Sequence, residues 1–210
     1  MLKIGLAIFP IFLMLVLSEL LWRKKILRGE AARKLLHIVI GSYIAFWPFF
    51  ISFTTIQLIS LALLFFVISS HKFRIFHAII DVKRMTYGDV LYAVGIGITA
   101  LLTKNPWIFA ITILHLSVCD GLAGLAGTRY GKSTNFYFAG QAKSMVGTLV
   151  FALSSYIILF LLVTPYLGVT IGPLLVLLPL AAALIESVGV FGTDNILVPL
   201  LMVLVLNTVV

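Results

Sequence analysis

Four of the seven acidic residues border long apolar stretches of the chain: Asp120, Glu186, Asp194 and, less deeply, Asp89. A carboxylate at the edge of a hydrocarbon layer is costly, so such a residue usually has a functional reason to be there. Asp120 ends the apolar run PWIFAITILHLSVCD and precedes GLAGLAGTRYGK, which is rich in glycine and then basic. An acid followed by glycines and cations suggests a site that binds a phosphate and a divalent cation.

Cations, hydroxyl groups and glycines continue after this segment. Lys143 and Ser144 are predicted to begin the next helix, so the N-terminus of that helix is a favourable place for a phosphate. Glycines in the same region free the backbone to present N–H groups. The candidate phosphate-binding residues of this region are Gly127, Arg129, Gly131, Lys132, Lys143, Ser144 and Gly147.

Glycines recur at every third position after Asp120, as Gly121, Gly124 and Gly127. On a helix these residues form a smooth stripe that a second helix or a ligand can approach closely. The sequence leaves both interpretations open.

A second acidic segment, ESVGVFGTDN, places Glu186, Asp194 and Asn195 in one short turn. Two carboxylates and an amide, with Asp120 nearby in a compact bundle, are suitable for Mg²⁺, which prefers one or two carboxylates together with phosphates and waters. Asp194 also suits the N-cap of the following helix, so a structural role stays open.

Arg33 and His37 are four residues apart and therefore share one face of a helix, with Lys34 between them. His37 lies about one turn inside an apolar stretch. A lone histidine in that position is usually a packing residue, whereas next to Arg33 it becomes a candidate phosphate ligand.

The elements that must position these residues are membrane helices. The chain is 62% hydrophobic and 10% charged, with a mean hydropathy of +1.20. These values predict a polytopic, all-α transmembrane bundle of seven or eight spans in a single membrane domain over residues 1–210. The eight candidate spans are about 2–22, 35–51, 53–70, 88–103, 106–126, 146–164, 170–188 and 196–209. The single cysteine, Cys119, excludes an internal disulfide.

The distribution of Lys and Arg predicts the orientation in the membrane. All of the 15 basic residues except Lys3 and Lys104 fall in loops near residues 23–34, 71–87 and 127–145. Basic loops are typically cytoplasmic, so both termini are expected outside, and the site, including the turn near 186–195, on the cytoplasmic face. The loop at 71–87 has an amphipathic pattern and is predicted to form a short interfacial helix. No soluble domain remains to bind a nucleic acid, despite the net charge of +8.

Four motifs in order resemble the polyprenol kinase family, which includes dolichol kinase, phytol kinase and the CTP-dependent diacylglycerol kinase and is related to the membrane cytidylyltransferases. They are Arg33-Lys34-x-x-His37-x-x-x-Gly41, Asp120-Gly121-x-Ala123-x-x-x-Gly127-x-x-x-Gly131, Lys143-Ser144-x-x-Gly147-Thr148, and Glu186 with Asp194-Asn195-x-x-x-Pro199. The resemblance spans residues 33–199. Cys119 stands where the family has a glycine before the first aspartate, and a small residue is thus retained.

The resemblance implies transfer of the terminal phosphate of CTP to a lipid alcohol: a polyprenol, phytol, geranylgeraniol or diacylglycerol. It implies Mg²⁺ held by Asp120 with Glu186 or Asp194, phosphate contacts from Arg33, Lys34, Thr148 and Asn195 besides the residues above, and a proton acceptor that is His37 or the remaining acid. The chain length suggests a prokaryotic cell-membrane enzyme. The alternatives are a phosphatidate cytidylyltransferase-like enzyme and a membrane transporter. A transporter would place its polar residues near the midplane, whereas here they gather on one side.

Overall fold

A computed structural model of the chain describes residues 2–73, 77, 87–170 and 172–210. Within these ranges the chain is mainly helical, as predicted. A 3-10 helix, η1 (Trp47–Phe49), follows the second helix, and a π-helical turn, η2 (His115–Cys119), joins α6 to α7. The α-helices are α1 (Leu2–Arg23), α2 (Gly29–Ala45), α3 (Phe53–Phe73), α5 (Gly88–Leu102), α6 (Pro106–Leu114), α7 (Asp120–Tyr130), α8 (Met145–Leu167), α9 (Leu174–Val188) and α10 (Asp194–Val209).

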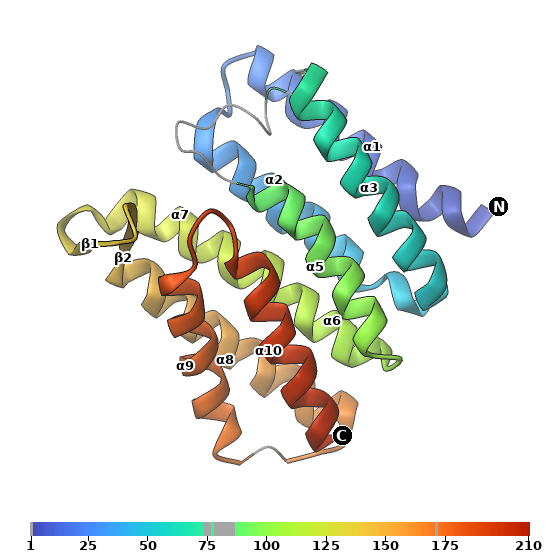
Figure 1. The fold of residues 1–210 in the computed structure, drawn as a ribbon, viewed down its shortest axis with the longest axis vertical. Helices are drawn as coiled ribbons and strands as arrows, with labels where there is room; N and C mark the ends of the chain where they lie inside the picture. The colour runs from blue at the N-terminus through green and yellow to red at the C-terminus, as the bar shows by residue number, and fades with distance from the viewer. Residues whose placement is uncertain (1, 74–76, 78–86, 171) are drawn as a thin grey trace.

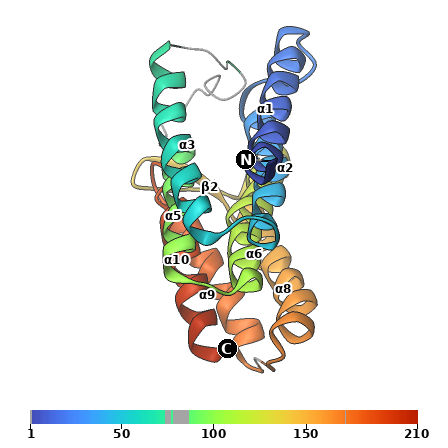
Figure 2. The same ribbon diagram turned by 90° about the vertical axis from the view of Figure 1, so that its right-hand side faces the viewer.

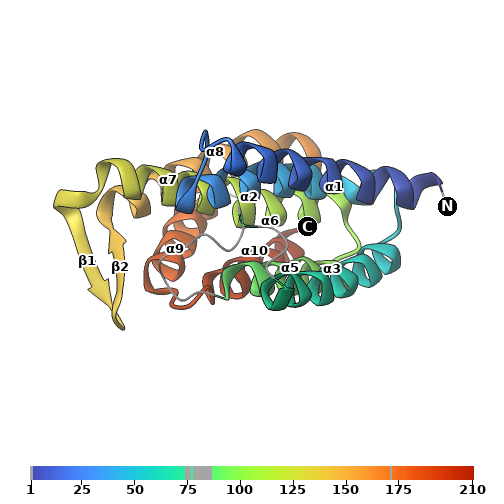
Figure 3. The same cartoon turned by 90° about the horizontal axis from the view of Figure 1, so that it is seen from above.

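The helices form two layers (Figures 1, 2 and 3). One layer contains α1, α2, α8 and the continuous helix α6–η2–α7, and the other contains α3, α5, α9 and α10. Contacts of α8 with α9 and of α6 with α10 join the two layers. Fully buried apolar side chains fill the space between helices, with Trp47 and Phe109 in one cluster and Phe151 and Met202 in a second.

The connections that carry the polar residues lie toward one end of the helices. The α1–α2 connection, the segment between α7 and α8, and the α9–α10 turn lie there, while both chain termini lie toward the other end (Figure 1). The bundle therefore has a polar end and an opposite end with the termini. The assignment of the polar end to the cytoplasm stays a prediction.

Four of the described helices are long and apolar enough to cross a membrane: Leu2–Arg23, Phe53–Phe73, Pro106–Tyr130 and Met145–Leu167. Three further apolar helices are shorter, namely α5, α9 and α10. Large apolar side chains point outward from several of these helices, which suits contact with lipid. Examples are Leu58, Phe65, Leu149, Leu153 and Leu177. The count of seven or eight spans stays a prediction.

The second predicted span, 35–51, is shifted along the chain. The helix α2 begins earlier, at Gly29, and ends at Ala45. Pro48 explains the early end, because proline has no N–H for the helical ladder and the residue before it disfavours the helical conformation. The chain forms η1 at this point instead.

A β-hairpin lies between α7 and α8 and is the only β-structure among the described residues, in a chain predicted to be all-α. Its strands are β1 (Asn135–Phe138) and β2 (Gln141–Ser144), which pair antiparallel with Phe138 opposite Gln141. Ala139 and Gly140 form the turn, with φ values of 45° and 78°. Lys143 therefore lies on a strand and not at the start of a helix. The amphipathic helix predicted within 71–87 lies mostly outside the described residues.

Candidate functional site

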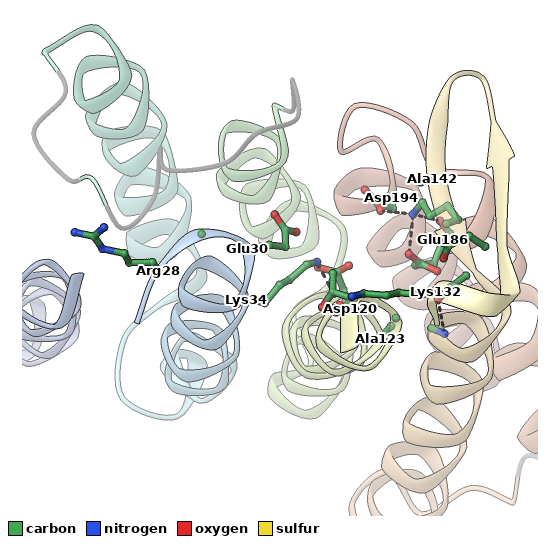
Figure 4. A pocket seen from close by; sticks show the side chains of 17 residues that line it. Arg28, Glu30, Lys34, Asp120, Ala123, Lys132, Ala142, Glu186 and Asp194 are labelled. Atoms are coloured by element: carbon green, nitrogen blue, oxygen red, sulfur yellow. Dashed lines mark hydrogen bonds and ion pairs between the residues drawn. The ribbon is translucent and has the colours of Figure 1, made fainter. Parts of the chain in front are cut away.

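A cavity of about 610 Å³ opens at the polar end of the bundle, between α2, α7, the hairpin and the ends of α9 and α10 (Figure 4). Its walls combine acids and cations with small residues that leave the space open. It is lined by Arg28, Gly29, Glu30, Lys34, Asp120, Ala123, Gly124, Gly127, Thr128, Lys132, Asn135, Ala142, Lys143, Ser144, Gly147, Glu186 and Asp194.

Asp120 forms part of the cavity wall and is only 8% exposed. It is the first residue of α7, and its Oδ2 lies 2.5 Å from Nζ of Lys34, which comes from α2. The same amine lies 3.4 Å from the backbone carbonyl oxygen of Asp120. Removing one partner of a buried pair of this kind typically costs about 3–5 kcal/mol, because the other charge is left uncompensated.

Lys143 joins the other two acids of the cavity. Its Nζ lies 2.7 Å from Oε1 of Glu186 and 3.3 Å from Oδ2 of Asp194, and it also donates to the carbonyl oxygen of Glu186 at 2.6 Å. Burial alone would lower the pKa of the Lys143 amine, but the two carboxylates outweigh burial and raise that pKa above its ordinary value. The amine therefore keeps its charge up to the ordinary lysine pKa of about 10.4 and loses it only at higher pH.

The three carboxylates form one group. One ligand oxygen from each of Asp120, Glu186 and Asp194 lies within 4.8 Å of the others. A second, small cavity of about 20 Å³ lies beside them and is lined by Asp120, Asp194 and Asn195 among others. The carboxamide oxygen of Asn195 is buried and accepts no hydrogen bond from any described residue. An acceptor of this kind next to clustered carboxylates fits a hydrated Mg²⁺.

Local structure fixes the elements around these side chains. Ser144 caps α8, because its hydroxyl oxygen accepts a hydrogen bond from the N–H of Gly147 at 3.0 Å. In the α9–α10 turn, Gly192 has a φ of 93°, and a Cβ there would lie 2.6 Å from Cα of Gly88. Only glycine satisfies both demands. Thr193 holds the N-cap position of α10, so Asp194 is the first residue of the helix and not its N-cap. Oδ1 of Asp194 accepts the backbone N–H of Asn195 at 3.2 Å, and its Oδ2 lies 3.3 Å from Nζ of Lys143.

The glycine stripe of α7 packs against neighbouring helices, which is one of the two interpretations that the sequence left open. Gly121 lies against Ile38 of α2, and a Cβ at Gly127 would lie 2.7 Å from Oγ of Ser144. Gly124 lies beneath the side chain of Lys34, because a Cβ there would come within 2.5 Å of Lys34 Cε. The stripe thus packs α7 against α2 and α8, and at Gly124 it gives Lys34 a path to Asp120.

Most of the predicted site residues line one of the two cavities. These are Arg33, Lys34, His37, Asp120, Gly127, Lys132, Lys143, Ser144, Gly147, Glu186, Asp194 and Asn195. Three predicted phosphate ligands line neither cavity, namely Arg129, Gly131 and Thr148. Arg129 is exposed, and its Cζ lies over the ring of Tyr130, 5.3 Å from the ring centroid. The hydroxyl of Thr148 donates to the carbonyl oxygen of Ser144 at 3.3 Å.

His37 and Arg33 reach only the small cavity. Nε2 of His37 lies 2.9 Å from the carbonyl oxygen of Leu116 and 3.4 Å from Oδ2 of Asp120. A carbonyl oxygen only accepts, so Nε2 is the donor in that hydrogen bond. Arg33 binds Glu30 at 2.6 Å on the same helix. Both residues therefore support the wall behind Asp120.

Sequence reasoning missed several residues of the large cavity. Glu30 lines it from the first turn of α2 while it pairs with Arg33. The spacing of three residues between Glu30 and Arg33 could have predicted this ion pair on one face of a helix. Asn135 and Ala142 line the large cavity from the hairpin, whose short strands give no strong pattern.

The comparisons with known proteins agree with the sequence motifs. The chain is 31% identical over 208 residues to the phytol kinase of Synechocystis sp., and the match covers 94% of this chain and 87% of that protein. The chain belongs to the polyprenol and phytol kinase family. No protein-family model and no solved structure matches it.

Proposed function

We propose that this protein phosphorylates the hydroxyl group of a membrane lipid alcohol, with CTP as donor and Mg²⁺ as metal ion. The main support for this proposal is one cavity at the polar end of the apolar bundle. The carboxylates of Asp120, Glu186 and Asp194 line it together with three lysines. Membership of a family with a phytol kinase supports a lipid alcohol kinase. Within that class, an isoprenoid alcohol such as phytol is the first substrate to test.

The acids are the proposed ligands of the metal ion. Asp120 and at least one of Glu186 and Asp194 would hold Mg²⁺, and the unpartnered amide oxygen of Asn195 suits one of its waters. When bound, Mg²⁺ neutralises charge on the nucleotide phosphates during transfer.

The cations of the cavity would hold the phosphates. Lys34, Lys132 and Lys143 all line it, and Figure 4 shows Lys34 and Lys132 extending toward Asp120 from different elements. The N-terminus of α8 adds backbone N–H groups next to Ser144, where an anion is favoured. Phosphoryl transfer depends mainly on such positioning and charge neutralisation.

In the proposed reaction, the oxygen of the lipid hydroxyl attacks the γ-phosphorus of CTP. A new P–O bond forms, the bond from the γ-phosphorus to the bridging oxygen breaks, and CDP leaves. The hydroxyl proton passes to one of the carboxylates. An acid suits this step better than His37, because Asp120, Glu186 and Asp194 line the large cavity and His37 lines only the small one.

A transfer assay tests the proposal. Purified protein is incubated with Mg²⁺, CTP or ATP labelled at the γ-phosphate, and a panel of phytol, geranylgeraniol, dolichol and diacylglycerol. We expect label in a lipid monophosphate, with CTP preferred. Label recovered in no lipid alcohol with either nucleotide would refute the function. Incorporation of α-labelled CTP into a lipid, with phosphatidate as acceptor, would identify the cytidylyltransferase alternative instead.

The cytoplasmic location of the site is part of the proposal. A cysteine replacing Asn135 would lie in the hairpin at the cavity wall, while the native Cys119 is fully buried. In intact cells, Asn135→Cys should resist a membrane-impermeant thiol reagent and react after the membrane is opened. Labelling of this cysteine in intact cells would show that the predicted orientation is wrong and that the site faces the outside.

A further inference from the structure

The three acids proposed to hold the metal ion are already paired with amines in this structure. Lys34 lies 2.5 Å from Asp120, and Lys143 bridges Glu186 and Asp194 at 2.7 and 3.3 Å. Their side chains are between 8% and 14% exposed, so water screens these charges little. The lysines thus contact the same three carboxylates that are proposed to bind the metal ion.

We propose that Lys34 and Lys143 act as internal counter-ions that exclude a free divalent cation, so that the site takes up metal and nucleotide together as one complex. This inference rests on the proposed function, because it needs the nucleotide phosphates as a second position for the amines. Under this inference, Lys34 contacts the nucleotide phosphates and also favours the metal–nucleotide complex over the free metal ion.

The energetic argument compares two ways for a metal ion to enter. A metal ion alone must displace two amines, which then stay buried beside a new dication and have lost their anionic partners. A metal ion that arrives with a triphosphate brings the missing negative charge. Lys34 and Lys143 both line the large cavity, so phosphates bound there lie within reach of amines that leave the carboxylates.

Gly124 makes this exchange possible for Lys34. The aliphatic part of Lys34 lies across Gly124, and a Cβ at that position would meet Cε at 2.5 Å and Cδ at 3.1 Å. Because the clash would be with the far end of a flexible side chain, Gly124→Ala should move the amine without disrupting the helices. Gly124 is therefore a positioning residue that acts through Lys34.

The main test measures Mn²⁺ binding to the full-length protein in detergent by electron paramagnetic resonance. Mn²⁺ is used because it prefers the same oxygen ligands as Mg²⁺. The nucleotide probe is CTP with a methylene group between the β- and γ-phosphorus atoms, which cannot transfer its phosphate. Lys34→Met should bind Mn²⁺ alone about tenfold more tightly than the wild type, and Mn²⁺ with nucleotide about tenfold more weakly.

Arg28→Met is the matched control. Arg28 lines the same cavity, and its substitution by Met removes one positive charge, as Lys34→Met does. Nε of Arg28 donates to the carbonyl oxygen of Trp22 at 3.3 Å, and Figure 4 shows the side chain pointing away from Asp120. The Arg28→Met variant should bind Mn²⁺ without nucleotide as tightly as the wild type does. An equal gain in Arg28→Met would mean that general charge, and not the paired amine, excludes the metal, and would overturn the inference.

If Lys34→Met does not fold, Gly124→Ala tests the counter-ion inference, because this variant keeps every charge of the chain. It should also tighten the binding of Mn²⁺ alone, by less than Lys34→Met. If the wild type binds Mn²⁺ with the nucleotide and neither variant gains affinity for Mn²⁺ alone, the counter-ion inference is wrong and the proposed function stands. If the wild type does not bind Mn²⁺ with the nucleotide, both fall.

Discussion

Two regions of this molecule bury an acid near the polar end of the bundle, and only one of the two acids lines a cavity. Glu19 of α1 is 7% exposed, nearly the same as Asp120 at 8%. Its Oε1 lies 3.1 Å from Nε of Arg23 and 3.1 Å from Nδ1 of His77, and its Oε2 accepts the backbone N–H of His77 at 2.8 Å. The ring of His77 also stacks on Trp22. Glu19 lines neither cavity described here.

The difference lies in the surroundings of the acids. Glu19 is a single carboxylate whose two oxygens are both satisfied by nearby groups, and it ties α1 to His77. Asp120 belongs to a group of three carboxylates that converge on a cavity large enough for a ligand. Burial of an acid alone therefore does not indicate function, whereas convergence of several acids on open space does.

The largest expected effect is at Asp120. Asp120→Asn keeps the shape of the side chain and an oxygen that can accept from Lys34, so the protein should fold, although with a lower free energy of unfolding because the buried amine loses its counter-charge. Loss of the carboxylate removes a metal ligand, and phosphate transfer should fall by at least about a thousandfold. A radiolabel transfer assay measures the loss, and size-exclusion chromatography checks the fold. Wild-type turnover in this variant would make Asp120 a structural residue like Glu19.

The next effect is expected at Lys143. Lys143→Ala removes a cation from the proposed phosphate site, and lost electrostatic stabilisers of this kind cost about 3–4 kcal/mol of transition-state stabilisation. The loss should appear in kcat and not only in the KM for nucleotide. Lys143→Arg should recover only part of the activity, because its planar group fits a compact phosphate pocket differently. Near-normal kcat in Lys143→Ala would reduce the role of Lys143 to pairing the acids.

Glu19→Gln should have the opposite profile. It removes a charge that Arg23 and His77 both contact, so the free energy of unfolding should fall by about 1–3 kcal/mol. Because Glu19 lines neither cavity, kcat per folded molecule should change by less than about twofold. Thermal denaturation and the transfer assay together separate the two effects. A large fall in kcat with unchanged stability would place Glu19 in the site and remove the contrast with Asp120.

The smallest effect is expected at Arg129. The motif predicts a phosphate contact there, but the side chain is exposed, lies over Tyr130 and lines neither cavity. Arg129→Gln should therefore change kcat and the KM for CTP by less than about twofold. A tenfold rise in KM would show that the nucleotide reaches beyond the described cavity.

The sequence predicted the helical membrane fold and the polar loops because both follow from local patterns. Asp120 and Glu186 stand where an apolar run ends and Asp194 where one begins, so a single polar end of the bundle brings them together. The pairing of Lys34 with Asp120 was not predictable, because it depends on which faces of α2 and α7 meet at Gly124. The hairpin was missed because four-residue strands leave little periodicity, and its turn begins with Ala139 at positive φ instead of a typical turn residue.

The π-helical turn before Asp120 affects how an insertion or a deletion in this helix would act on the site. Each residue of an α-helix rotates the side-chain direction by about 100°, and η2 (His115–Cys119) absorbs one extra residue without ending the helix. A regular α-helical wheel drawn through the turn would therefore place Asp120 about 100° away from its actual direction. Loss of one residue within 116–119 would restore a regular helix and leave Asp120 facing Lys34. The same loss after Asp120, within α7, would instead turn the glycine stripe away from α2.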